Sequence, residues 1–372
     1  MDATRFARRA ACKFGAATDK SKNGANIKRR EFIKGAATCA AGLAVGLDLF
    51  AQQTGEIGAA NLTDGVDLSG AKNLGEKFAA MTPYLTLNNR ILMPIIGLSA
   101  AKFDGLKDKN ALGAALGLGY RLIDTDGGEE AAVAAFAASG LERGQLFIQS
   151  ALGAQNGDES GMIKSFEHSL KKLNTDYVDL LLLHAGAGNT SSAWRVLQRL
   201  YREGLAAAIG ICDYPGKFGV ENLAKIAQGS EVKPAVYQTH SRSYLRHFAT
   251  RGKVTDHDVQ VQLLYEPGEE LKEPALAQIS EKYGKTRSQI ILRWLVQHGV
   301  CTVVNFASKE RLLENIDIFG FELADEAGFV LKFVCLKFGK LGVMANFKSI
   351  LLICRAKFAS LIDVKFGFSG LG

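Results

Sequence analysis

The sequence predicts a (β/α)8 barrel over residues 82–327, and three observations support this fold class. Short apolar runs alternate with amphipathic segments from Tyr84 onward. Several of these runs are almost continuously hydrophobic, as expected of parallel strands that are buried on both faces. No GxGxxG motif follows the first run, which argues against an open dinucleotide-binding sheet.

Eight apolar runs are expected to form the strands of the barrel. They are residues 93–98, 120–124, 146–150, 177–184, 207–212, 235–239, 259–264 and 301–305. The stretches between them, such as 161–173, 192–203 and 288–298, have the spacing of apolar side chains that predicts covering helices. The active site of such a barrel lies at the carboxyl ends of its strands. The polar residues there are the candidates for a site: Asp124, Ser150, His184, Cys212, Asp213, Gln238, Thr239, Tyr265 and Asn305.

The net charge of +7 resides in the two ends of the chain. Residues 1–34 carry ten Lys or Arg against three Asp or Glu, and residues 328–372 carry seven basic residues and one acidic residue, Asp363. The part between them is therefore mildly acidic, which argues against a nucleic-acid partner for the folded body. The six cysteines include no CxxC pair and no His at zinc-ligand spacing, so no metal site is predicted.

The amino-terminal segment, residues 1–51, is expected to be a leader, followed by a linker over residues 52–81. Lys28-Arg29-Arg30-Glu31-Phe32-Ile33-Lys34 precedes a weakly apolar run. Paired arginines before such a run resemble a twin-arginine export signal, which implies the export machinery as a partner and a periplasmic or exported protein. The alternative is an amphipathic or disordered leader, in which case the protein stays in the cytoplasm.

The carboxyl-terminal segment, residues 328–372, mixes apolar residues with regularly spaced Lys and contains no Pro. A basic apolar segment can lie on an anionic membrane surface. Two other interpretations stay open, namely a divergent terminal helix pair and a tail translated from an altered reading frame.

Five segments of the central body resemble motifs of the aldo-keto reductase family. They are Gly119-Tyr-Arg-Leu-Ile-Asp-Thr125, Asp176-Tyr-Val-Asp-Leu-Leu-Leu-Leu-His184, Gly210-Ile-Cys-Asp-Tyr214, Pro234-Ala-Val-Tyr-Gln238 and Arg311-Leu-Leu-Glu-Asn315. The resemblance implies reduction of a small-molecule carbonyl substrate with NADP or NAD. In the family a Tyr protonates the carbonyl oxygen, a Lys paired with an Asp lowers the pKa of the Tyr, and a His orients the substrate. Asp124 and His184 occupy the Asp and His positions.

Two of the four catalytic residues implied by the resemblance are absent. Gly127 falls at the Tyr position, in a loop that is two residues shorter than in the family, and Ala151 falls at the Lys position. General acid–base help is worth about 10²- to 10⁴-fold in rate. Asp126, Glu129 and His184 are the nearest groups that could supply a proton instead. A tyrosine from another loop, Tyr214 or Tyr244, could do the same.

The resemblance also implies the cofactor-binding residues. Gln238 would bond the nicotinamide carboxamide and Tyr265 would stack on its ring, while Cys212 and Asp213 replace the usual Ser-Asn pair. Three further residues would face the adenosine half, with Arg311 reaching a 2′-phosphate: Arg311, Glu314 and Asn315. The family's Lys-Ser before this helix is not recognisable, which weakens the case for NADP over NAD.

Two interpretations of function follow. The first is an aldo-keto reductase-like oxidoreductase whose catalysis is impaired or altered. The second is a non-catalytic barrel, a pseudoenzyme that binds a nucleotide or acts as a scaffold. Asp124 and His184 would then be structural residues at strand ends, and Arg311 and Glu314 would lie on a solvated helix face.

Overall fold

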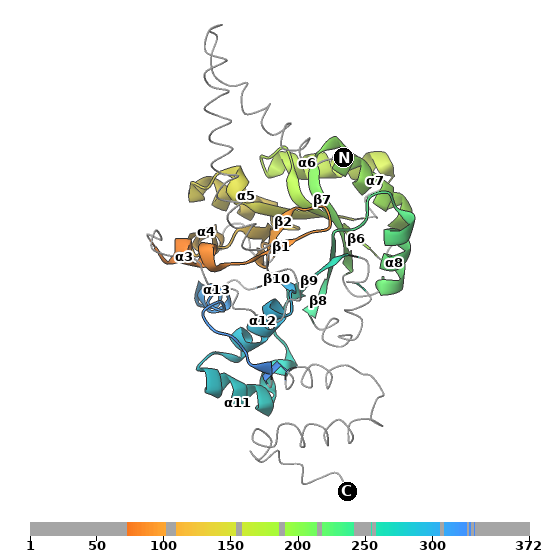
Figure 1. Ribbon diagram of the computed structural model, residues 1–372. Coiled ribbons are helices and arrows are strands. Elements are labelled where there is room, and N and C mark those ends of the chain that lie inside the picture. The colour runs from red at the N-terminus through yellow and green to blue at the C-terminus, as the bar shows by residue number, and fades with distance from the viewer. Residues whose placement is uncertain are drawn as a thin grey trace, which may run out of the picture.

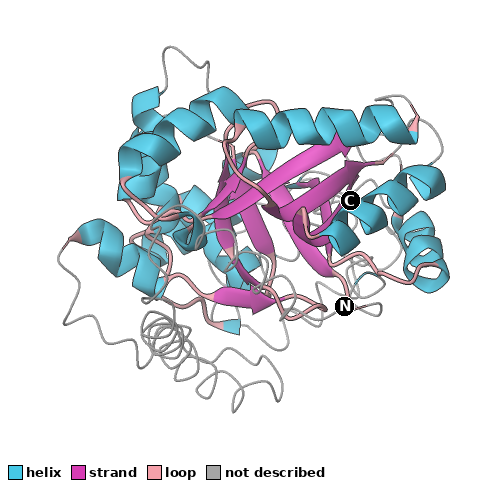
Figure 2. Ribbon diagram, turned by 90° about the horizontal axis from the view of Figure 1, so that it is seen from above, coloured by secondary structure: helices cyan, strands magenta, loops and turns pink. Residues whose placement is uncertain are grey.

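The computed structural model shows a closed barrel of eight parallel strands surrounded by helices (Figure 1, Figure 2). It describes residues 73–101, 109–153, 158–185, 190–213, 218–241, 254, 258–305, 309–325, 327–328 and 331. The segment 1–51 and the chain from residue 332 on lie outside the described residues. The expectations of an export leader and of a membrane-binding tail therefore stay predictions.

The strands follow each other around the barrel in chain order, and the last one pairs with the first. They are β3 (Ile96–Ser99), β4 (Leu122–Asp124), β5 (Phe147–Gly153), β6 (Val178–His184), β7 (Ala206–Asp213), β8 (Val236–His240), β9 (Gln260–Tyr265) and β10 (Cys301–Val304). This confirms the predicted (β/α)8 fold. All eight expected strands are present, although their ends differ by up to a few residues.

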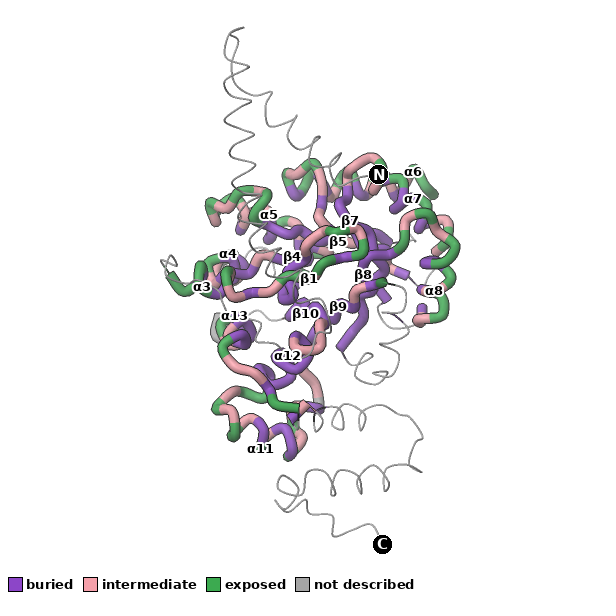
Figure 3. Tube along the Cα trace, viewed as in Figure 1, coloured by how far each residue is buried: buried purple, intermediate pink, exposed green. Residues whose placement is uncertain are grey.

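Helices connect the strands and cover the outside of the barrel. They are α4 (Lys109–Gly117), α5 (Glu129–Ser139), α6 (Glu159–Lys172), α7 (Thr190–Glu203), α8 (Val220–Gly229), α11 (Pro274–Tyr283), α12 (Arg287–Gln297) and α13 (Lys309–Ile316), with short 3-10 turns η1 (Arg143–Gln145) and η3 (Glu269–Lys272). Figure 3 shows buried strands inside and helices whose outer faces are exposed. No helix in the described part of the chain is long and apolar enough to cross a membrane.

Apolar side chains form one core inside the barrel and a second between the barrel and its helices. Helix α7 shows how the second core forms, because it buries Ala193, Trp194, Leu197 and Leu200 at three- and four-residue spacing. Each large side chain buried in this way contributes roughly 1.5–3 kcal/mol. The strands approach closely enough that a Cβ atom at Gly210 would lie 2.5 Å from the carbonyl oxygen of Val236.

A hairpin of β1 (Tyr84–Thr86) and β2 (Leu92–Pro94) covers the amino-terminal end of the barrel. The amides of Asn88 and Asn89 donate to the carbonyl oxygens of Pro234 and Ala207, at 2.8 and 2.9 Å. Met93 thus belongs to the hairpin, and the first barrel strand begins only at Ile96. The prediction of one strand over residues 93–98 was wrong on this point, because Pro94 has no N–H with which to continue the ladder.

The linker expected over residues 52–81 ends in helix α3 (Leu74–Met81). The side chain of Asn73 accepts the backbone N–H of Glu76 at 3.0 Å, which caps the first turn of the helix. Phe78 is buried against the outer core. The residues between 73 and 81 are therefore part of the folded body.

Candidate active site

Polar side chains gather at the carboxyl-terminal mouth of the barrel, where β4, β6 and β8 end with Asp124, His184 and Gln238–His240. Strand register places His184 beside Gly153 on one side and Cys212 on the other. Cys212 is in turn paired with Gln238. The sequence correctly predicted that these strand ends would meet.

Asp124 is 6% exposed and accepts two hydrogen bonds. The backbone N–H of Asp126 donates to Oδ1 at 3.3 Å, and Nε2 of Gln238 donates to Oδ2 at 3.3 Å. Burial, reinforced by the charge of Asp126, raises the pKa of the Asp124 carboxyl to about 7. Asp124 is therefore partly protonated at neutral pH.

His184 is joined to a residue that lies outside the family pattern. Its Nε2 lies 2.8 Å from Oδ2 of Asp126, in the loop after β4. The side chains of His184 and Asp126 are 32% and 42% exposed, so this pair faces solvent at the mouth. The hydrogen bond to Asp126 raises the pKa of His184, against the effect of its partial burial.

A chain of amides runs from Asp124 into the barrel interior. Nε2 of Gln238 also donates to Oε1 of Gln262 at 2.9 Å, and Nε2 of Gln262 donates to Oε1 of Gln149 at 2.8 Å. Nε2 of Gln149, which is fully buried, has no hydrogen-bond partner among the described residues. The polar chain thus fixes the rotamer of Gln238 and ends in an unsatisfied donor.

The two positions at which the family's Tyr and Lys are missing differ in their surroundings. Gly127 has a φ of +70°, and a Cβ atom there would meet nothing within 4 Å. Ala151 packs against the inner core of the barrel. Glu129, one of the candidate proton donors, is turned toward α6, where its Oε1 accepts the hydroxyl of Ser169 at 3.4 Å. Tyr214 and Tyr244 lie outside the described residues.

Asp213 holds the loop that leads to α8. Its carboxylate accepts the backbone N–H groups of Phe218 and Gly219, at 2.9 and 3.1 Å, and the hydroxyl of Tyr237 at 2.5 Å. Its neighbour Cys212 is buried in the inner core. These contacts give Asp213 a structural role, and its predicted contact with the cofactor stays a prediction.

Tyr265 differs in orientation from the expected stacking residue. It is completely buried and belongs to the outer core, whereas its neighbour Leu264 packs against the inner core. A ring with no exposed surface offers no face to a ligand in this conformation. The stacking role predicted for Tyr265 would require its ring to leave this core.

The residues expected at the adenosine half lie on and beside α13. Nη1 of Arg311 is 3.1 Å from Oε2 of Glu314, and the Arg311 side chain is 50% exposed. Glu314 also accepts the hydroxyl of Thr286 at 2.5 Å. Asn315 is buried, and within the described residues its Nδ2 has no hydrogen-bond partner; the same is true of Oδ1 of Asn305, at the end of β10.

These observations fit a nicotinamide cofactor at some positions and not at others. The described contacts of Gln238 use its N–H groups and leave its carbonyl oxygen for a carboxamide donor. The unpaired amide atoms of Asn305 and Asn315 and the exposed Arg311 suit the adenosine half. Asp213 and Tyr265 do not suit the nicotinamide half. No cluster of His, Cys, Asp and Glu in the described ranges is placed to hold a metal ion.

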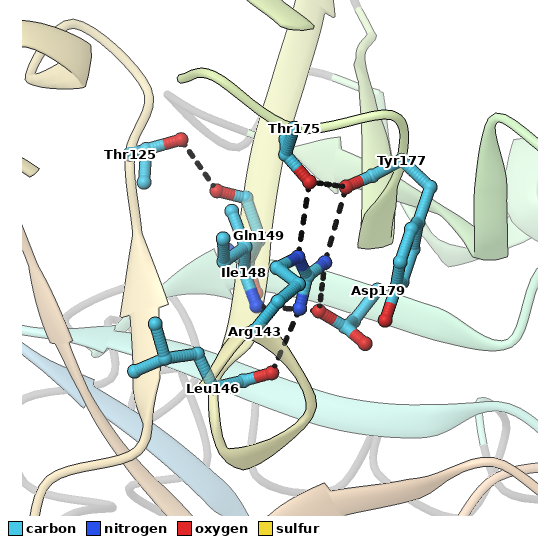
Figure 4. Close-up of polar contacts among 8 residues, drawn as sticks. All are labelled: Thr125, Arg143, Leu146, Ile148, Gln149, Thr175, Tyr177 and Asp179. Carbon is cyan, nitrogen blue, oxygen red and sulfur yellow. Dashed lines mark hydrogen bonds and ion pairs between the residues drawn. The ribbon is translucent and has the colours of Figure 1, made fainter. Parts of the chain in front are cut away.

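The other end of the barrel carries a polar cluster that stabilises the fold (Figure 4). Arg143 donates to the hydroxyl of Thr175, to the carbonyl oxygens of Leu146 and Tyr177, and to the carboxylate of Asp179 at 2.7 Å. Asp179 also accepts the backbone N–H of Ile148 at 2.8 Å. This cluster ties the starts of β5 and β6 together and lies away from the mouth.

Sequence reasoning missed three features of the site. The contact of Asp126 with His184 depends on the shape of a loop shorter than the family's, and only the acidic residue after Thr125 hinted at it. The hydrogen bond from Tyr237 to Asp213 joins the residue before Gln238 to one of the two residues that replace the family's Ser-Asn pair. The amide chain had its signal in Gln149 and Gln262, polar residues within apolar strands that were passed over.

A closed barrel of eight parallel strands surrounded by helices defines the (β/α)8 fold class. Residues 96–254 match the family described as the aldo/keto reductase family. An aldo-keto reductase of Mycolicibacterium smegmatis is 35% identical over 258 residues, which cover 67% of this chain and 89% of the relative. The chain therefore belongs to the aldo-keto reductase family, whose chemistry is NAD(P)H-dependent carbonyl reduction.

Two further comparisons agree with this assignment. A glyoxal reductase of Bacillus subtilis is 35% identical over 248 residues, covering 64% of this chain and 88% of that protein. The crystal structure of an aldo/keto reductase from Brucella melitensis superposes with a TM-score of 0.64 at 30% identity, covering 68% of this chain and 99% of that one.

Proposed function

We propose that this protein reduces a small carbonyl compound with a nicotinamide cofactor, through an acid step that differs from the one typical of its family. The observation that carries the proposal is the mouth of the barrel. His184 and Asp124 face it from the ends of β6 and β4, and Gln238 is held beside Asp124. Tyr and Lys are absent from their usual positions, so catalysis is altered in its proton donor.

The described residues suggest how such a cofactor would be held. Oε1 of Gln238 would accept a hydrogen bond from the carboxamide, while Asp124 and Gln262 fix the amide plane of Gln238. Arg311 and Asn315 would hold the adenosine half. When bound, the reduced cofactor supplies the hydride that reduces a carbonyl carbon. Because Arg311 is already paired with Glu314, we expect a modest preference at most for NADPH over NADH.

The proposal is tested by titrating NADPH and NADH against the full-length protein while following cofactor fluorescence. Glyoxal and other small dicarbonyls are the first substrates to try, since a relative bears the name glyoxal reductase. Gln238→Leu should weaken binding of both cofactors, and Arg311→Ala should weaken NADPH binding more than NADH binding. No binding at millimolar cofactor would refute the proposal.

A second candidate function is a non-catalytic barrel that binds a nucleotide. Gly127 and Ala151 favour it, because their replacement of Tyr and Lys removes the family's acid. Cofactor binding without carbonyl-dependent oxidation of NADPH would support this candidate. An oxidation rate that disappears on His184→Ala would exclude it.

Export through the twin-arginine route is part of the proposal and rests on Arg29 and Arg30. Replacing both arginines by Lys should keep the protein in the cytoplasm of a bacterial host, which fractionation would reveal. Membrane contact of residues 328–372 would be tested by flotation with anionic liposomes, with and without that segment.

A further inference from the structure

We propose that His184 is the proton donor of this site and that Asp126 is the residue that positions and charges it. The inference rests on the proposed function, because it concerns the acid step of the same reaction. It assigns a role to Asp126, which has no counterpart in the family motif that this chain resembles. It also explains how a site without the usual Tyr and Lys retains an acid.

The geometry of the pair supports this assignment. Asp126 Oδ2 lies 2.8 Å from Nε2 of His184, which is within ordinary hydrogen-bonding distance. The backbone N–H of Asp126 is bonded to Asp124, which fixes the start of the loop that presents the carboxylate. Gly127, in the left-handed region with a φ of +70°, turns the chain immediately afterwards. The backbone of the loop therefore holds Asp126 at the mouth.

A carboxylate on one ring nitrogen leaves the other for chemistry. With Asp126 on Nε2, the free nitrogen of His184 is Nδ1, which makes no hydrogen bond with a described residue. In serine hydrolases a carboxylate on Nδ1 fixes the tautomer and stabilises the imidazolium while Nε2 transfers the proton; here the two ring nitrogens exchange these roles. The His184 side chain is 32% exposed, so part of the ring is open to solvent.

The charges around His184 favour its protonated form. The titratable groups that act on it are Asp126 in the loop after β4 and Asp124 at the end of β4, and both raise its pKa. Its strand neighbours, Gly153 on β5 and Cys212 on β7, bring no positive charge. A lysine in place of Ala151 would oppose protonation, whereas the alanine does not.

The step balances with the cofactor of the proposed function. The π bond of the carbonyl breaks, its carbon receives a hydride from the reduced nicotinamide, and its oxygen receives the proton from Nδ1 of His184. The carbonyl compound is thus reduced by two electrons to an alcohol, and the cofactor is oxidised by two. His184 becomes neutral and regains a proton from water, to which it is exposed.

The test compares Asp126→Asn, Asp126→Glu and a matched control, Glu130→Gln. Glu130 is exposed on the first turn of α5, so its replacement removes the same charge four residues away. NMR titration of the full chain gives the pKa of His184, identified by the signal that His184→Asn lacks. Carbonyl-dependent NADPH oxidation gives kcat against pH, and cofactor fluorescence gives binding.

In Asp126→Asn the pKa of His184 should fall toward its ordinary value of 6.5. The alkaline limb of the pH profile of kcat should shift to lower pH by the same amount, and kcat should fall about tenfold or more. Asp126→Glu should keep most of the raised pKa of His184 and most of kcat, and Glu130→Gln should change neither quantity. Cofactor binding should be the same in all these variants.

Three results would overturn the inference. One is a higher kcat in Asp126→Asn, because Asp126 would then restrain His184 instead of charging it. Another is a pH profile that ignores the change in the pKa of His184. The last is loss of activity in Tyr214→Phe or Tyr244→Phe with a normal His184 pKa. Failure of the wild-type protein to bind cofactor would instead refute the proposed function, and the NMR result would distinguish the two.

Discussion

The amide nitrogen of Gln238 lies 3.3 Å from the carboxylate of Asp124, and among the described residues no Lys or Arg shares this contact. The buried carboxyl of Asp124 is thus hydrogen-bonded by amides and lacks the Lys that the family has at the position of Ala151. The consequences for stability, for the mouth and for the barrel interior can each be measured.

The first prediction concerns the pH dependence contributed by Asp124. Its folded-state pKa, about 7, lies above the ordinary 3.8, so the folded protein binds more protons than the unfolded chain between these values. Stability from this group is therefore greatest at low pH and is lost as pH rises toward 7. Asp124→Asn should be more stable than wild type at pH 8, by about 1–4 kcal/mol.

Urea unfolding at several pH values between 4 and 8 would measure this difference. The gap between variant and wild type should widen as pH rises and should be smallest near pH 4. Equal stability of the two proteins at pH 8 would show that ionisation of Asp124 does not destabilise the folded protein.

A second prediction concerns the missing cation. Ala151→Lys should place an ammonium group beside Asp124 and lower the pKa of that carboxyl. The additional stability of Asp124→Asn at pH 8 should then shrink or vanish when it is measured in the Ala151→Lys background. Ala151→Met, which introduces a long side chain without a charge, is the control and should leave that difference unchanged in urea unfolding.

A third prediction concerns Gly127. Its φ of +70° is unfavourable for a residue with a Cβ atom, although space is available there. Gly127→Ala should destabilise the protein by about 1–2 kcal/mol. Gly113, inside α4, also has open space but no positive φ, so Gly113→Ala should stabilise by about 0.5–1 kcal/mol.

Thermal unfolding of these two variants would separate backbone strain from crowding. Gly127→Tyr should carry the same backbone strain, and with Ala151 in place of the family's Lys no cation would lower the pKa of its phenol. A destabilisation of similar size at both positions would contradict the assigned backbone conformation.

A fourth prediction concerns the amide chain of the barrel interior. Gln262→Leu would remove the acceptor of one N–H of Gln238, which keeps its bond to Asp124, and the donor to Oε1 of Gln149. It should cost about 2–4 kcal/mol, at 1–3 kcal/mol for each unsatisfied group. Gln149→Leu removes an Nε2 that is already unpaired and takes one acceptor from Gln262, whose Nε2 keeps contacts with the sulfur atoms of Met93 and Cys301, so it should be milder. Denaturant unfolding of both variants gives the comparison. Equal losses of stability would contradict the hydrogen-bonded chain of amides.

Strand-end reasoning predicted which side chains would meet at one rim, because this follows from the parallel order of the strands. Asp124, His184 and Gln238 end apolar strands, and parallel strands bring such ends to one rim. The orientation of Tyr265 escaped this reasoning, because both it and Leu264 are apolar enough to face either core. Alternation gives the period of a strand but not its phase when both faces are buried.

Loop contacts were beyond sequence reasoning for a different reason. The pairing of Asp126 with His184 joins positions 58 residues apart, and it depends on the path of a loop in which Gly127 has a φ of +70°. Asp213 could have faced a ligand or the loop before α8, and only the three-dimensional path of residues 218–219 decides for the loop. Local residue types did not distinguish these outcomes.

The cluster around Arg143 and Asp179 affects what the sequence similarity of this protein to its family means. Asp179 and Tyr177 belong to one of the segments that most resembles the family, yet they lie at the rim opposite His184 and hold strands in register. That part of the resemblance therefore measures shared architecture and carries no information about turnover. Sequence similarity that comes from residues of the barrel framework persists when the residues at the mouth are replaced. The activity of distant relatives is therefore judged from the residues at the mouth.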